Sequence, residues 1–163
     1  MSGFGEWVSR ARKGDAIMEL GHLNNHQVHD FARFRAAAAA LVNGYRAVEV
    51  VGRHTRLTVD GKTAQVNSRR QPGSPWQFNA DRPVVDDAVA VIFVDLTGDA
   101  PDFYIAPGQW VRDDVKQHYA AWLESKGGTR PRNPGSDHAG VELDRIRQWH
   151  QRWDVLAGSA QEN

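Results

Sequence analysis

Residues 53–70, RHTRLTVDGKTAQVNSRR, decide the fold because they form two alternating runs joined by Asp60-Gly61. A type I′ turn needs positive φ at both central residues, and Asp-Gly is among the pairs that supply it. The turn also sets the strand register, in which Arg56 lies directly opposite Gln65. This stretch therefore predicts a β-hairpin.

The two faces of the predicted hairpin differ in chemistry, because side chains alternate along a strand. One face suits a protein core and consists of Thr55, Leu57, Val59, Ala64 and Val66. The other face carries hydrogen-bonding side chains, namely His54, Arg56, Thr58, Thr63, Gln65 and Asn67. We expect the functional residues on this second, polar face.

The composition sets limits on the class of protein. A chain of 163 residues is long enough for one domain with a sizeable core, so we expect a single domain over 1–163. Twenty basic residues balance twenty acidic ones, which excludes a strong global attraction to polyanions. There is no cysteine, which excludes disulfides and thiolate metal sites. No run approaches the roughly 20 apolar residues of a membrane span, and we expect a cytoplasmic protein.

Local patterns predict the remaining elements. Asn24 or Asn25 is expected to cap a helix that ends at Asn43-Gly44 and carries an apolar stripe. The residues of that stripe are Val28, Phe31, Ala38, Leu41 and Val42. Further strands are expected at 45–51, 76–79, 88–96 and 102–106. A second helix is expected over 110–125 with Val115, Tyr119, Trp122 and Leu123 inward, and a last helix over 141–156 with Leu143, Ile146, Trp149 and Trp153 buried.

This order of elements predicts an α/β (α+β) fold, with a central mixed β-sheet of about five strands flanked by helices. Residues 1–23 are an N-terminal extension in this prediction, and 141–156 form a C-terminal helix. The sequence does not determine whether the extension packs on the sheet or on a second subunit.

Several short motifs support a family resemblance. The second strand of the hairpin reads AQVN (64–67) and is followed by SRR (68–70), and the later strands read VIFVDL (91–96) and DFYIAP (102–107). In this order the motifs resemble the PD-(D/E)xK, restriction-endonuclease-like nuclease superfamily, over roughly residues 25–125. The resemblance implies that the core is a nuclease fold.

The resemblance also implies where a catalytic centre would lie. In active members an Asp on the second strand and an acidic or Gln residue on the third hold Mg²⁺, and a Lys two residues further on assists the attacking water. Here Gln65 takes the acidic or Gln position and Asn67 takes the Lys position, while His54 and Arg56 stand where the Asp is expected. The resemblance thus implies a degenerate active site with no cofactor.

Two possible metal sites remain as alternatives. Glu49 and Asp30 would replace the missing ligands beside Gln65 in an active Mg²⁺-dependent endonuclease, with Gln65, Asn67 and Glu49 as its catalytic candidates. The histidines at 22, 26 and 29 have spacings that suit a transition metal if they share a helix face.

The leading prediction is a nucleic-acid-binding or regulatory module, with DNA as the expected partner and no membrane association. Its phosphate contacts are expected from His54, Arg56, Arg69 and Arg70. The second hypothesis is the Mg²⁺-dependent endonuclease, and the third is a protein–protein scaffold that binds no nucleic acid. The oligomeric state is left open by the sequence.

Overall fold

The computed structural model describes residues 19–52, 55–129 and 138–158. It has the predicted α+β architecture, with a five-stranded mixed sheet in the order β1-β2-β3-β5-β6 and a separate two-stranded sheet of β4 and β7. Strands β3 and β5 are parallel, and the other neighbours are antiparallel. The strands are β1 (Val48–Val50), β2 (Arg56–Val59), β3 (Lys62–Arg69), β4 (Trp76–Asn79), β5 (Ala88–Asp95), β6 (Asp102–Pro107) and β7 (His138–Val141). The helices are α1 (Asn25–Val42), α2 (Gly108–Ser125), α3 (Leu143–Ile146), η2 (Arg147–Trp149) and η3 (Trp153–Ala157).

The predicted hairpin is confirmed as β2–β3. Asp60 and Gly61 have φ values of 47° and 79°, as a type I′ turn requires, and the four pairs from β2 to β3 have the predicted register. The Asp60 carboxylate accepts backbone hydrogen bonds from Arg46 (3.0 Å) and Ala47 (2.7 Å), which tie the turn to the segment before β1. His54 lies outside the described residues.

Helix α1 begins where the sequence predicts, because Asn24 and Gln27 form a capping box. The predicted apolar stripe is correct for Val28, which is buried, and for Phe31, which is partly buried against the core. It is wrong for Ala38, Leu41 and Val42, which are exposed, because the helix buries Ala32, Arg33, Ala36 and Ala40 in their place. Small side chains spaced four residues apart let the helix lie close to the sheet, and this close packing outweighs the larger side chains on its other side.

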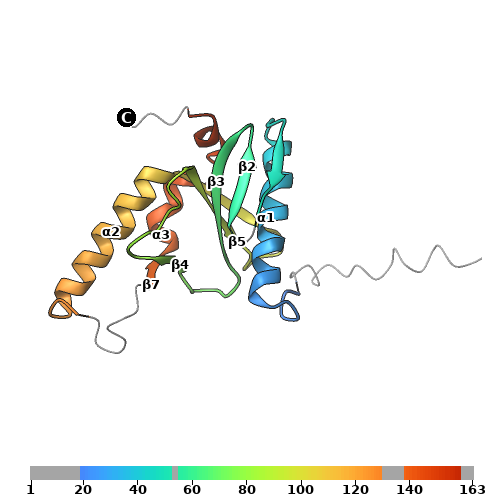
Figure 1. Cartoon of the computed structure of the whole chain (residues 1–163). Helices are drawn as coiled ribbons and strands as arrows, with labels where there is room; N and C mark the ends of the chain where they lie inside the picture. Colours follow the sequence, from blue (N-terminus) through green and yellow to red (C-terminus); the bar gives the residue numbers. More distant parts are fainter. Residues whose placement is uncertain (1–18, 53–54, 130–137, 159–163) are drawn as a thin grey trace, which may run out of the picture.

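The two faces of the main sheet are covered by different elements (Figure 1). Helix α1 packs on the face of Ala64 and Val66, where Ser68 Oγ lies 3.2 Å from His29 Nδ1. The β4–β7 ribbon covers the opposite face. There the Trp76 and Phe93 rings pack edge to face, with their centroids 5.5 Å apart. The polar face of the hairpin is therefore partly covered by protein.

Helix α2 follows β6 directly, and Gly108 makes this connection possible. A Cβ at Gly108 would lie 2.5 Å from the backbone oxygen of Ala88, so only glycine fits there. The predicted inner face is correct for Val115, which is buried, but Trp122 is 38% exposed because the helix extends beyond the sheet (Figure 1). No helix in the described ranges carries an apolar stretch long enough to cross a membrane.

The predicted C-terminal helix from Val141 is wrong. Val141 ends strand β7, which pairs with β4, and three short helical turns follow instead of one helix. Gln151, with φ of 53°, separates the last two turns. Trp149 and Trp153 are nevertheless buried as predicted. Their side chains pack in the hydrophobic core although the segment does not form one continuous helix.

Candidate nucleic-acid interface

Gln65 is buried beneath the loop that leads into β5. Its Oε1 accepts a hydrogen bond from the backbone N–H of Val85 (2.9 Å), and its Nε2 donates to the Pro83 carbonyl (2.9 Å) and to Asn67 Oδ1 (2.9 Å). Asn67 in turn donates from Nδ2 to the Gln77 carbonyl at 3.2 Å. Both amides therefore join β3 to the layer above it.

Arg56 lies directly opposite Gln65 and has its own acidic partner. Its Nη1 donates to Asp87 Oδ2 at 2.6 Å, and Thr63 Oγ1 donates to the same oxygen at 3.4 Å. The hydrogen bond from Arg56 holds the pKa of Asp87 below its ordinary value. The position where the resemblance implies a metal-binding Asp thus holds a surface ion pair.

Arg69 is turned into the protein, with its side chain only 8% exposed. Its Nη2 donates to Asp95 Oδ2 (2.7 Å), its Nη1 donates to the Ser74 carbonyl (2.9 Å), and its guanidinium carbon lies 4.1 Å from the Trp76 ring centroid. Arg69 therefore presents no accessible guanidinium for the phosphate contact predicted from the sequence.

Arg70 points to the opposite face of the sheet. Its Nη1 donates to the carbonyls of Leu20 (3.2 Å) and Leu23 (2.8 Å), and its Nη2 donates to Asn25 Oδ1 (3.2 Å). These bonds hold the chain that enters α1. Consecutive side chains along a strand point to opposite faces of the sheet. The alternation in the sequence therefore already indicates that Arg69 and Arg70 do not form one cationic patch.

The ligands of the alternative Mg²⁺ site do not come together. Glu49 pairs with Thr58, which places its Cα roughly 12 Å from that of Gln65 by strand spacing and rise. Asp30 lies on α1, across the sheet from Gln65, and its carboxylate accepts from Arg33 at 2.6 Å. Among the described residues, His22, His26 and His29 included, no three His, Asp or Glu side chains form a metal-binding group.

A polar hollow lies where β3 extends past the start of β2, and we call it the β3 pocket. Its volume is about 490 Å³. Nearly all of its lining side chains have hydrogen-bonding groups. They are Asn25, His29, Thr55, Asn67, Ser68, Arg69, Arg70, Gln71, Ser74, Pro75 and Gln77. Amides and hydroxyls that offer both donors and acceptors suit a neutral polar ligand such as the edge of a base.

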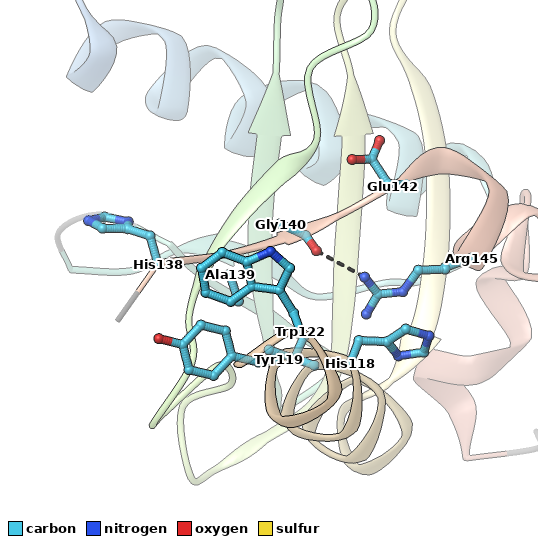
Figure 2. Close-up of a pocket in the computed structure, with 9 residues that line it drawn as sticks. His118, Tyr119, Trp122, His138, Ala139, Gly140, Glu142 and Arg145 are labelled. Carbon is cyan, nitrogen blue, oxygen red and sulfur yellow. Dashed lines mark hydrogen bonds between the residues drawn. The ribbon is translucent and has the colours of Figure 1, made fainter. Parts of the chain in front are cut away.

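A second hollow lies between α2 and β7, and we call it the aromatic groove (Figure 2). Its volume is about 390 Å³, and its lining residues are Val115, His118, Tyr119, Trp122, His138, Ala139, Gly140, Glu142 and Arg145. The Tyr119 and Trp122 rings are stacked, with centroids 5.9 Å apart and an interplanar angle of 22°. Such a wall suits a planar ligand.

Arg145 forms the polar end of the aromatic groove (Figure 2). Its Nη1 donates to the Gly140 carbonyl at 2.9 Å, and its Nε donates to Asp114 Oδ2 at 3.1 Å. The Asp114 carboxylate is largely buried and also accepts from Arg145 Nη2. This ion pair fixes β7 and α3 against α2 and so holds the groove open.

Residues that line the β3 pocket and residues that line the aromatic groove are neighbours at the β4–β7 ribbon. Pro75 lines the pocket and Gly140 lines the groove, and a Cβ on Gly140 would lie 3.0 Å from Pro75 Cγ. Gln77, also in the pocket, pairs directly with Gly140. An extended ligand that crosses the ribbon would thus reach both hollows.

The sequence did not identify the aromatic groove. Tyr119 and Trp122 lie on α2 at helical spacing, which predicted a buried inner face rather than an exposed wall. His138 precedes the predicted C-terminal helix, and Arg145 lies within it. No local pattern links these segments, because the pairing of β4 with β7 joins residues about 60 positions apart.

Gln65→Glu tests the structural role of the buried amide. The carboxylate keeps the acceptor for Val85 but faces the oxygens of Pro83 and Asn67 in place of two donated hydrogen bonds. We expect the free energy of unfolding to fall by about 3 kcal/mol in urea denaturation. Mg²⁺ at millimolar concentration should not restore the loss.

The matched control is Gln77→Glu, the same change at an exposed position of β4, which should cost less than about 0.5 kcal/mol. A Gln65→Glu protein as stable as the wild type, or one that Mg²⁺ stabilises strongly, would instead show that position 65 accepts a metal ligand.

Comparison of the chain with protein-family models, with curated proteins and with solved structures finds no match in any of the three. The assignment of function therefore depends on the geometry of the two hollows.

Proposed function

We propose that this chain is a nucleic-acid-binding module with a restriction-endonuclease-like fold and no hydrolytic activity. The order α1, β1, β2, β3 with β5 parallel to β3 agrees with the PD-(D/E)xK resemblance. At the positions of the family's acid and lysine, Gln65 and Asn67 hydrogen-bond to the protein itself. Their structural roles support binding without catalysis.

The observation that carries the proposal is the proximity of Pro75, which lines the β3 pocket, to Gly140, which lines the aromatic groove. Amide side chains such as Gln71 and Gln77 can recognise the edge of an unpaired base, and the Trp122 wall can stack on the face of the next one. In a duplex the faces of the bases are stacked and their Watson–Crick edges are paired, so neither is accessible. We therefore infer that the ligand is a single strand.

The charge balance adds a quantitative expectation. With 20 basic and 20 acidic residues and Arg69 buried, few phosphates can be neutralised. Each neutralised phosphate of a single strand contributes a slope of about −0.7 to the plot of log affinity against log salt concentration. We expect one or two such contacts and hence a shallow salt dependence, with stacking as the larger contribution.

Variants in the two hollows test the proposal. Trp122→Ala should weaken binding of a labelled single strand of about 12 nucleotides by roughly 5- to 150-fold, because stacking contributes about 1–3 kcal/mol per base. Gln71→Glu combined with Gln77→Glu should weaken it by at least roughly tenfold, since two carboxylates would face the strand. Fluorescence anisotropy at about 50 mM salt, with DNA and RNA strands, measures both effects.

Gln117→Glu is the control for each of the two glutamine changes, because it adds one negative charge at an exposed position of α2 outside both hollows. It should bind as the wild type does. Failure of the wild type to bind any single strand at low salt would reject the proposal and favour the protein scaffold. Cleavage that requires Mg²⁺ and is abolished by EDTA would favour the endonuclease, and Glu49→Gln and Asp30→Asn would then identify its ligands.

A further inference from the structure

The polar end of the aromatic groove presents two N–H groups that have no acceptor in the described part of the chain. The first belongs to the backbone of Gly140, which pairs with Gln77 in the β4–β7 ribbon. The Gly140 carbonyl accepts from Arg145 at 2.9 Å, and the Gln77 carbonyl accepts from Asn67 at 3.2 Å, so both carbonyls point out of the ribbon. The two residues are therefore a non-hydrogen-bonded pair, and the Gly140 N–H points to the same side as its carbonyl, toward the groove.

The second N–H belongs to Arg145, whose guanidinium carries five N–H donors. Its Nε and Nη2 donate to Asp114 Oδ2, and Nη2 also donates to the Asp114 carbonyl at 3.4 Å. One Nη1–H donates to the Gly140 carbonyl (Figure 2). These four bonds are all that the described residues give to Arg145, so one Nη1–H remains next to the Gly140 carbonyl and beside the Gly140 N–H.

The two donors together carry little net charge. The side chains of Asp114 and Arg145 are 11% and 19% exposed, and the carboxylate pairs with the guanidinium. The negative charge of Asp114 offsets the attraction of the guanidinium for an anion, since both charges act over nearly the same distance. This end of the groove therefore suits two neutral acceptors better than a phosphate.

We propose that the aromatic groove selects a guanine base, an inference that rests on the single-strand binding proposed above. Guanine has two adjacent acceptors, O6 and N7, on one edge, whereas adenine has the N6 amino donor beside N7. Two neighbouring N–H groups match the guanine pair and would face the adenine amino group with another donor. Cytosine also has two adjacent acceptors, but its single ring covers less of the Tyr119–Trp122 wall. The groove volume of about 390 Å³ suits one base.

Atomic changes in the base test the proposal with the full wild-type chain. The probes are labelled thymidine strands of about 12 nucleotides that carry one central dG, dA, dC or 7-deaza-dG, measured by fluorescence anisotropy at about 50 mM salt. The dG strand should bind roughly 5- to 150-fold more tightly than the dA strand, which is the discrimination that a good bidentate contact provides. The 7-deaza-dG strand keeps O6 and lacks N7, so it should lose most of this advantage.

Arg145→Lys tests the protein side of the contact. The lysine ammonium can still pair with Asp114, but it lacks the planar fork that reaches Gly140 as well. The ratio of the dG affinity to the dA affinity should fall to within about twofold of one. Arg147→Lys is the matched control, because Arg147 is 64% exposed, pairs with Asp144 and lies outside both hollows. It should keep the wild-type ratio.

The wild-type measurements decide the inference even if Arg145→Lys does not fold. Equal affinities for the dG and dA strands would overturn guanine selection and leave the proposed function in place. Tighter binding of the dC strand than of the dG strand, or a 7-deaza-dG strand that binds as tightly as dG, would overturn it too. Failure of all four strands to bind would reject the proposed function itself, and guanine selection with it.

Discussion

Trp76→Ala is expected to lower the free energy of unfolding by about 4 kcal/mol. Trp76 is fully buried between the main sheet and the β4–β7 ribbon, with its ring 5.5 Å from Phe93 and its Nε1 donating to the Val94 carbonyl at 3.2 Å. Alanine would leave a cavity, remove the hydrogen bond from the indole N–H and leave the Arg69 guanidinium without the ring beneath it. Urea denaturation followed by circular dichroism measures the loss.

Trp122→Ala is the matched control for this prediction. Trp122 is 38% exposed on α2, so the same truncation should cost about 1 kcal/mol or less while it impairs binding of a single strand. The two tryptophans should thus separate stability from binding. Equal losses of stability in the two variants would contradict the assignment of Trp76 to the centre of the fold.

Arg69→Met is expected to lower the free energy of unfolding by about 3–5 kcal/mol. Asp95 is buried beside Arg69, and the substitution would leave its carboxylate without a cationic partner. Asp95→Asn in the same chain should recover part of the loss, because the remaining amide carries no charge and still accepts from the Thr97 N–H (3.0 Å). Additive losses in the double variant would contradict a coupled pair.

The pH dependence of this pair has a definite sign. Burial alone would raise the pKa of Asp95, but hydrogen bonds from Arg69 and Thr97 outweigh it and hold the pKa below its ordinary value. A carboxyl with a lowered pKa in the folded state stabilises the protein above its unfolded pKa of about 3.9 and loses that contribution as the pH falls. The stability difference between wild type and Arg69→Met should therefore be largest near neutral pH and shrink in acid.

Prediction from the sequence was most successful for local features and for the division of the hairpin into two faces. Leu57 and Val66 are buried as the alternation requires, and Gln65 and Asn67 lie on the polar side. The burial of this polar side was not predictable, because alternation identifies a face and does not specify what covers it. Here the cover is a ribbon whose second strand begins at His138.

The candidate site was predicted only in part for the same reason. Asn67, Arg69 and Arg70 all line the β3 pocket, but the Arg69 guanidinium pairs with Asp95, a residue 26 positions away. Glu49 and Asp30 were grouped by chain proximity and residue type, yet they belong to different layers of the fold. The sequence could not predict that the stacked rings of Tyr119 and Trp122 lie beside β7, because no local pattern relates α2 to that strand.

The sequence by itself determined the turn at Asp60-Gly61, the start of α1 at Asn24 and the strand-forming character of residues 88–95. Backbone sterics and hydrogen bonds within about four residues specify these features, so they do not depend on the rest of the chain. Tertiary structure alone decided which face of α1 is buried and that the loop before β5 covers Gln65. It also decided that lining residues of the two hollows, Gln77 and Gly140, are paired, because the free energy of packing depends on surfaces that come from distant parts of the chain.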